Sequence, residues 1–91
     1  MGVRKIDIYK DAIIYEEKLK IDLMKFINSV CKERELSQKE IGEILKVKQP
    51  RVSDLQKLKS VHFSITILHR MSYVLGYREK KSERGLNLVK I

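Results

Sequence analysis

The sequence predicts a single all-α domain, a compact bundle of about five short helices with room for a short strand at its C-terminal end. Apolar residues recur at helical spacing along most of the chain, which indicates amphipathic helices with one buried face. Serine and glycine stand where helices typically begin and end, and the only proline is Pro50. The 91 residues suffice for one hydrophobic core, because a second would need roughly 50 residues of its own.

The N-terminal third predicts two helices. Asp11 can accept a hydrogen bond from an early backbone amide and so caps a helix over residues 12–18. A second helix covers residues 19–30, with a buried face formed by Leu19, Leu23, Phe26, Ile27 and Val30. No glycine or proline separates the two helices, so whether one runs into the other stays open. Residues 1–10 alternate weakly and are either an edge strand or an arm.

Two short helices joined by a tight connection are expected in the middle of the chain. Ser37 and Glu40 have the spacing of a capping box, in which the serine oxygen accepts from an early amide while the glutamate reaches back. That helix ends near residue 46, and after a three-residue connection the next covers about residues 49–58. Pro50 stands early in this second helix, where its missing N–H costs nothing.

One further helix and a terminal strand complete the expected fold. Ser64 caps the helix, and Gly76 is placed to end it. The last six residues, 86–91, have the composition of a strand. The chain therefore divides into an N-terminal extension over 1–18, a helical domain over 19–77 and a basic tail over 78–91.

Positive charge is concentrated in two segments of the chain. Twenty Lys and Arg stand against twelve Asp and Glu, a net charge of +8. Residues 46–60 hold five basic residues and one acidic, a net +4, and the tail holds five and two, a net +3. A local basic excess indicates an anionic partner. The part of the tail before the strand either contacts phosphates or is a solvated linker.

Pattern and charge agree on the second of the two short helices. Two short helices that follow a longer amphipathic helix and precede another have the layout of a helix-turn-helix unit. In that unit the second helix lies in the major groove of DNA, where glutamine can bond the edge of adenine and arginine that of guanine. The outward positions here are Lys48, Gln49, Arg51, Ser53, Asp54 and Lys57. The sequence therefore predicts binding to double-stranded DNA.

Residues 36–55 also resemble a known family. The segment begins with Leu36-Ser37-Gln38, continues with Ile41-Gly42 and Leu45, and ends with Gln49-Pro50-Arg51-Val52-Ser53-Asp54-Leu55. This pattern is similar to that of the Cro/C1-type helix-turn-helix regulators of bacteria and phages, the XRE family, which implies a lambda-repressor-like bundle over about residues 19–77. The Gln-Pro-Arg-Val-Ser variant is similar to the branch that contains HigA-type antitoxins.

The resemblance implies roles for individual residues. By position, Gln38 would contact a phosphate. The residues that would read or lie beside base edges are Gln49, Pro50, Arg51, Ser53 and Asp54. We expect further phosphate contacts from Lys39, Lys48, Lys57 and Lys59.

The sequence departs from the family in three places. Lys48 replaces a Ser or Thr cap, so the second short helix is expected to start raggedly, and Leu58 stands in place of a helix-ending glycine, so its end is expected to lack the usual left-handed residue. Asp54 brings an anion to the groove, which can read cytosine but lowers the general affinity for DNA.

Other classes of function lack support in the sequence. Paired carboxylates, a glycine-rich phosphate loop and a nucleophile–base spacing are all missing, so an enzyme is not expected. Cys31, His62 and His69 have no partners at metal-ligand spacing, so neither a metal nor a cofactor is expected. No apolar stretch approaches the roughly 20 residues of a membrane span. With no apolar leader at its start, the chain is expected to be cytoplasmic, in a bacterium or phage-infected cell.

Two kinds of protein partner are expected besides DNA. One helix-turn-helix module buries little surface, so a symmetric homodimer is predicted. Its candidate contacts are the apolar termini (Ile6, Ile8 and residues 86–91) or the helix around Met71 and Val74. The alternative function is that of an antitoxin that binds a toxin protein encoded nearby and represses its own operon. Residues 1–18 would then lie along the toxin; otherwise they pack on their own domain as an extra helix.

Overall fold

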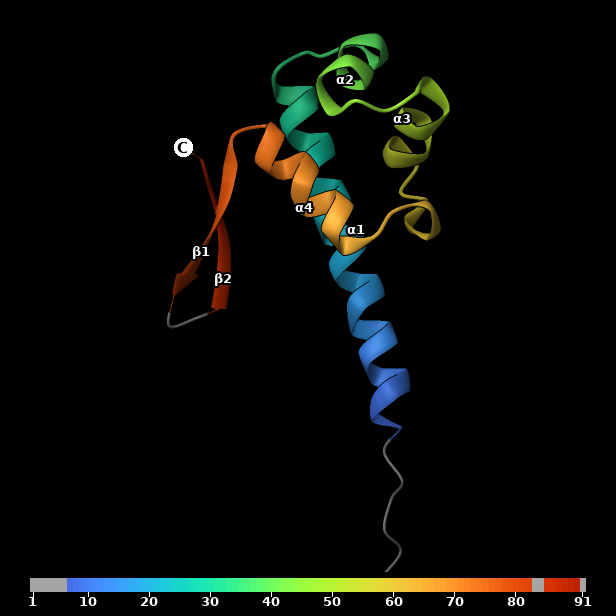
Figure 1. The fold of residues 1–91 in the computed structure, drawn as a ribbon, viewed down its shortest axis with the longest axis vertical. Coiled ribbons are helices and arrows are strands. Elements are labelled where there is room, and N and C mark those ends of the chain that lie inside the picture. Colours follow the sequence, from blue (N-terminus) through green and yellow to red (C-terminus); the bar gives the residue numbers. More distant parts are fainter. Residues whose placement is uncertain (1–6, 83–84, 91) are drawn as a thin grey trace, which may run out of the picture.

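The computed structural model describes residues 7–82 and 85–90, with side chains placed except at 79–82 and 85–87. This part of the chain contains four α-helices, one 3-10 helix and one antiparallel hairpin (Figure 1). In chain order they are α1 (Ile8–Glu33), α2 (Gln38–Leu45), α3 (Gln49–Gln56), the 3-10 helix η1 (Ser60–His62), α4 (Ile65–Val74), β1 (Tyr77–Ser82) and β2 (Gly85–Lys90). The other helices gather around the C-terminal half of α1 (Figure 1).

The first helix, α1, is continuous over 26 residues, so the two helices expected in this region are fused. Its N-cap is Asp7, whose carboxylate accepts a hydrogen bond from the Lys10 amide at 3.0 Å. The expected cap was wrong: Asp11 lies in the first turn, where its charge favours the helix dipole. With no glycine or proline to stop the helix, each further residue adds a backbone hydrogen bond. The described residues therefore hold four α-helices rather than about five.

The N-terminal half of α1 extends beyond the bundle (Figure 1). Residues 8–18 are exposed, whereas Leu23, Met24 and Ile27 are buried. The boundary expected between residues 18 and 19 falls inside this helix, at the point where its residues begin to be covered. The chain from residue 8 onward is thus neither a strand nor a separate helix folded back on the domain, and residues 1–6 lie outside the described part.

The turn that follows α1 explains how the chain reverses into α2. Glu35 adopts a left-handed conformation with φ 56°, and the Leu36 amide donates to the Cys31 carbonyl at 3.0 Å. These are the features of a Schellman motif, in which the apolar residue after the left-handed one packs back on the helix. The expected capping box is confirmed: Ser37 Oγ accepts from the Glu40 amide at 3.1 Å, and Glu40 Oε1 accepts from the Ser37 amide at 3.0 Å.

One hydrophobic cluster holds the four helices together. Its buried members are Leu23, Met24, Ile27, Val30, Cys31, Ile41, Leu45, Val52, Leu55, Phe63, Leu68, Met71 and Leu75. Fully burying a side chain of this size contributes about 1.5–3 kcal/mol. A polar contact adds direction, because the Asn28 side chain donates to the Leu55 carbonyl at 2.9 Å and so ties α3 to α1. Because α3 is only 8 residues long, its orientation depends on these contacts with the core and with α1.

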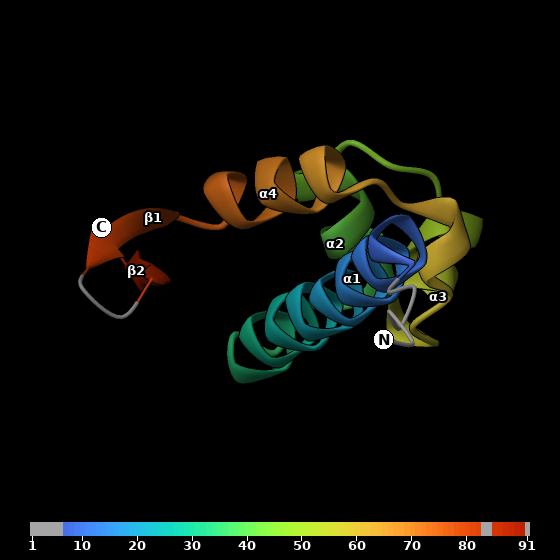
Figure 2. The ribbon, with the colours of Figure 1, turned by 90° about the horizontal axis from the view of Figure 1, so that it is seen from below.

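The C-terminal third contains more strand than expected. Ser64 caps α4, as predicted, by accepting from the Ile67 amide, and Gly76 follows the helix with φ 95°. The expected terminal strand is present as β2, and it pairs antiparallel with β1, where a tail was expected (Figure 2). Tyr77 anchors the hairpin to α1 through an edge-on contact with Phe26, with ring centroids 4.8 Å apart. The fold is thus a helical bundle with a short two-stranded sheet beside it.

Candidate nucleic-acid interface

The helix α3 presents one buried and one outward face. Val52 and Leu55 are buried against the core. Because successive residues are spaced about 100° apart around a helix, the side directly opposite them is formed by Pro50, Ser53, Asp54 and Lys57. Gln49 and Arg51 then flank this stripe on its two sides. All six outward positions predicted from the sequence are thus at least partly accessible.

The start of α3 follows the expected departure from the family, and its end does not. Its N-cap, Lys48, makes no side-chain capping hydrogen bond, as the absence of Ser or Thr predicted. At the other end the expectation was wrong, because Leu58 itself adopts the left-handed conformation, with φ 58°. The Lys59 amide donates to the Asp54 carbonyl at 2.9 Å and completes the helix end. Packing of Leu58 against the core compensates for a conformation that costs a leucine about 1–2 kcal/mol.

The turn between α2 and α3 depends on Gly42. A Cβ at this position would lie 2.9 Å from the Val47 carbonyl oxygen, closer than non-bonded atoms approach. The Val47 amide also donates to the Gly42 carbonyl at 3.0 Å, while Lys46 takes the left-handed conformation with φ 59°. The close approach of these backbones fixes the angle between α2 and α3, and with it the position of the outward face.

A chain of three glutamines links α2 to α3. Gln38 Nε2 donates to Gln56 Oε1 at 2.7 Å, and Gln49 Nε2 donates to Gln38 Oε1 at 3.2 Å. Each Nε2 carries a second hydrogen, so Gln49 can still offer one donor and its Oε1 acceptor to a ligand. Sequence reasoning missed Gln56. Its spacing of seven residues from Gln49, which places both on one side of α3, was the signal that could have found it.

On the other side of α3, Arg51 belongs to a cluster of charged and aromatic groups. Its guanidinium lies 3.7 Å from an Asp54 carboxylate oxygen and 5.8 Å from the centre of the Phe63 ring. The same Asp54 oxygen lies 3.9 Å from His62 Nε2. The anion expected to weaken DNA binding is therefore partly neutralised by its neighbour on the helix. His62 is an exposed residue of η1, and the structure brings it to this edge of α3.

Lysines stand at both ends of α3. Lys39 is the second residue of α2, Lys46 and Lys48 lie in the turn before α3, and Lys57 and Lys59 follow its last residue. All five are exposed. Phosphates border a DNA groove on both sides, so cations at both ends of a groove-bound helix can contact both backbones. The structure thus places hydrogen-bonding groups between two groups of cations.

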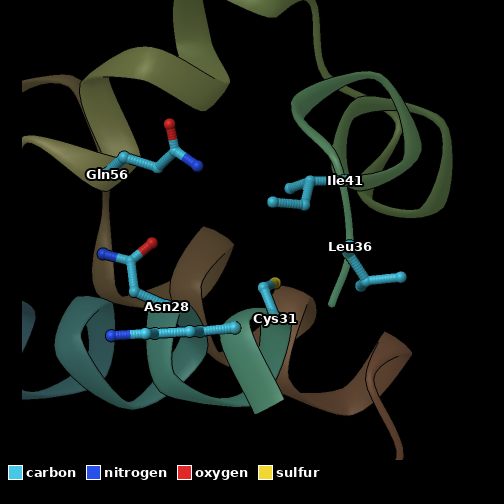
Figure 3. Close-up of a pocket in the computed structure, with 6 residues that line it drawn as sticks. Asn28, Cys31, Leu36, Ile41 and Gln56 are labelled. Carbon is cyan, nitrogen blue, oxygen red and sulfur yellow. The ribbon is translucent and has the colours of Figure 1, made fainter. Parts of the chain in front are cut away.

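A hollow next to Gln56 lies between α1, α2 and α3. It has a volume of about 340 Å3 and is lined by Asn28, Cys31, Lys32, Leu36, Ile41 and Gln56 (Figure 3). Burial raises the pKa of the Cys31 thiol above its ordinary value, against a smaller opposite effect of the Arg34 charge. A thiol in this state is a poor nucleophile and metal ligand. Across the described side chains, no group of three His, Cys, Asp or Glu could hold a metal ion.

Among the helices of the described residues, none is both long and apolar enough to cross a bilayer.

Comparison with known proteins agrees with this geometry. A family model described as a helix-turn-helix domain matches residues 10–78, from the first turns of α1 to the start of β1. No match is found among curated proteins or among solved structures. The matched segment includes α2, the Gly42 turn, α3 and the core that orients them. The chain belongs to the helix-turn-helix domain family, whose members are expected to bind DNA.

Proposed function

We propose that the protein is a sequence-specific regulator of transcription that binds double-stranded DNA as a repressor-like homodimer of the Cro/C1 type. The observation that carries this proposal is the composition of the α3 surface. Hydrogen-bonding side chains occupy its middle, and exposed lysines stand at both of its ends. This is the distribution that a helix needs in order to read base edges between two phosphate backbones.

The proposed base contacts begin with Gln49. Its Oε1 accepts from N6 of an adenine while the remaining Nε2 hydrogen is donated to N7 of the same base. The hydrogen bond to Gln38, at 3.2 Å, holds the side chain in place while this happens. Gln38 lies at the start of α2, where the first backbone amides of the helix also favour a phosphate. Pro50 and Ser53 then pack beside the contacted base.

Arg51 requires a change of partner. Its ion pair with Asp54 is 3.7 Å long and partly exposed, with 43% of the arginine side chain accessible. Pairs of this kind contribute about 0–1 kcal/mol, whereas a bidentate contact with guanine is worth about 1–3 kcal/mol of discrimination. The guanidinium therefore exchanges the carboxylate for a guanine edge. Asp54 is then left near cytosine N4, which donates to carboxylates.

Antitoxin activity is the second candidate function. The observation that favours it is the set of exposed isoleucines in the N-terminal half of α1 (Ile8, Ile13 and Ile14), which the proposed DNA-binding surface does not use. A toxin could lie along this helix while α3 binds the operator. Co-purification with the product of the adjacent gene, repeated with residues 1–18 removed, tests this function. If no neighbour binds the full chain, the plain regulator remains.

The DNA-binding proposal is tested by comparing operator with random DNA. Bound duplexes are first selected from a random pool, and the ratio of the two affinities is then measured by fluorescence anisotropy. Gln49→Ala and Arg51→Ala should each lower this ratio by about 5- to 150-fold, the equivalent of 1–3 kcal/mol. Arg70→Ala removes an exposed charge from α4 and serves as the control, with the ratio unchanged. Full retention of the ratio by the α3 variants would contradict the proposal.

A further inference from the structure

The short helix η1 places His62 beside α3. Ser60, at the start of η1, is buried, and its hydroxyl donates to the Glu17 carboxylate of α1. Phe63, directly after His62, is 3% exposed and belongs to the core. The His62 amide also donates to the Lys59 carbonyl, at 3.2 Å. The backbone is thus fixed on both sides of His62, while its side chain remains 46% accessible.

His62 contacts the Arg51–Asp54 pair of α3 in two ways. Its Nε2 lies 3.9 Å from Asp54 Oδ2, the same oxygen that lies 3.7 Å from the Arg51 guanidinium. Its backbone carbonyl accepts a long hydrogen bond from Arg51, at 3.5 Å. The guanidinium and the imidazole therefore share one carboxylate oxygen, and each is placed to be the partner of Asp54 when the other is absent.

The charges around His62 come from α1 and α3, the two helices that pack against η1, and from the segment before η1. They are Arg51 and Asp54 on α3, the bonded Glu17 and its neighbours Glu16 and Lys20 on α1, and Lys57 and Lys59 in the preceding segment. Glu16 pairs with Lys20 at 4.0 Å, and Glu17 is engaged by Ser60. Among the described side chains, Asp54 is the one acid within 4.0 Å of the imidazole. A proton gained by His62 is therefore stabilised chiefly by Asp54.

Reading a guanine removes the partner of Asp54. In the proposed complex the Arg51 guanidinium leaves the carboxylate for the base edge, and the negative charge of Asp54 stays at the DNA surface. A carboxylate near phosphates without a cation is unfavourable, because like charges repel and the bound DNA displaces water that would screen them. Histidine can supply the missing positive charge, because its side chain gains a proton within the physiological range of pH.

We propose that His62 is a positioning residue for base readout, which takes up a proton when the operator binds and replaces Arg51 as the partner of Asp54. This exchange rests on the DNA-binding function proposed above and adds the step that releases Arg51. The proton comes from the solvent, both ring nitrogens then carry hydrogen, and Nε2–H faces Asp54 Oδ2. The other carboxylate oxygen remains for cytosine N4. On random DNA, without a guanine in register, Arg51 keeps its ion pair and His62 stays neutral.

The pH profile of the operator-to-random affinity ratio tests this exchange. Binding that takes up a proton tightens as pH falls, because the coupling between proton and DNA is reciprocal. For the wild type the ratio should rise about 2- to 5-fold between pH 8.5 and pH 6, as expected for a partly exposed ion pair. His62→Gln keeps a hydrogen-bonding side chain without the charge, so its ratio should not change with pH. His69→Gln removes the other histidine of the chain, on α4, and should keep the wild-type profile.

Calorimetry measures the proton itself. Titrations of operator DNA into protein at pH 7.5, in buffers with different ionisation enthalpies, give the number of protons taken up on binding. The wild type and the His69→Gln variant should take up a fraction of a proton per protomer, and His62→Gln close to none. Asp54→Asn leaves no carboxylate to neutralise, so its uptake should also be close to none. Circular dichroism checks that each variant stays folded.

The outcomes separate this exchange from its alternatives. Equal tightening on operator and random DNA at low pH would mean that His62 attracts phosphates regardless of sequence, and uptake that persists in Asp54→Asn would mean that the imidazole contacts DNA directly. Either result overturns the proposal. A wild type that selects its operator but shows neither a pH-dependent ratio nor proton uptake overturns the exchange and leaves the proposed function intact. Failure to bind any duplex would instead end the proposed function, and the exchange with it.

Discussion

Gln56 and Lys57 are adjacent at the end of α3, and their substitution should change different properties of DNA binding. Gln56 belongs to the glutamine chain, through its 2.7 Å hydrogen bond with Gln38. Lys57 is exposed at the helix end and faces the phosphates in the proposed complex. A base-reading position affects the preference for one sequence, whereas a phosphate contact affects all sequences and the response to salt. The pair therefore separates the two kinds of contact within one turn of helix.

The expected magnitudes follow from the number of phosphate contacts. Four lysines (Lys39, Lys48, Lys57 and Lys59), each with one phosphate, give a slope of log K against log salt of about −3.6 per protomer and about −7 per dimer. Lys57→Ala removes one contact per protomer, so the slope should become about −5.4. When salt rises from 50 to 200 mM, the affinity of the wild type should fall about 20,000-fold and that of Lys57→Ala about 2,000-fold.

For Gln56→Ala, the slope should stay at its wild-type value. The variant loses one hydrogen bond that holds Gln38, and through it Gln49, so the operator-to-random ratio should fall about 2- to 12-fold, the equivalent of 0.5–1.5 kcal/mol. Fluorescence anisotropy titrations across the salt range measure both quantities. An unchanged slope in Lys57→Ala together with a reduced slope in Gln56→Ala would refute the assignment of these two positions.

Three further predictions concern the scaffold. Glu35→Gly relieves a left-handed φ of 56° and should raise stability by about 1 kcal/mol, seen as an increase of about 4–8 °C in Tm by calorimetry. Gly42→Ala should cost about 1–3 kcal/mol and weaken operator binding, because its Cβ would meet the Val47 carbonyl at 2.9 Å. The hydrogen bonds from Ser37 hold the pKa of Glu40 below its ordinary 4.5. The contribution of the ionised Glu40 to folding stability is therefore fully present above pH 4.5 and is lost as pH falls through the lowered pKa. In NMR titrations, Ser37→Ala should raise the Glu40 pKa.

The local signals in the sequence located the helix-turn-helix part of the fold well. Ser37 with Glu40 and Ser64 cap helices where predicted, because a side chain that accepts from a nearby amide acts within one turn. The residue that follows α4, Gly76, has the positive φ that glycine allows. Likewise, the outward positions of α3 could be read from helical periodicity alone, since Val52 and Leu55 mark its buried side.

Features that depend on distant contacts were missed. One local choice was missed as well, because Asp7 and Asp11 are both suitable caps in sequence, and the helix begins at Ile8 with Asp7 accepting from the Lys10 amide. The residues of β1 are highly charged and do not alternate, so their strand conformation follows from pairing with β2 rather than from their own pattern. Leu58 takes a conformation that its type disfavours, because tertiary packing decides there. The hydrogen-bonding partner of Gln56, Gln38, comes from another helix, so in the sequence only the helical spacing from Gln49 marks this residue.

The glutamine chain of α2 and α3 has a consequence for the thermodynamics of recognition. A free glutamine side chain loses about 1.5–2 kcal/mol of rotamer entropy when it is fixed against a base. Gln49 is already hydrogen-bonded to Gln38, and Gln38 to Gln56, before any DNA arrives. Part of the ordering is thus completed during folding, and the unbound protein already favours the bound rotamers. Operator binding by the wild-type protein should therefore have a smaller entropic penalty than operator binding by the Gln56→Ala variant. Calorimetry at several temperatures can measure this difference.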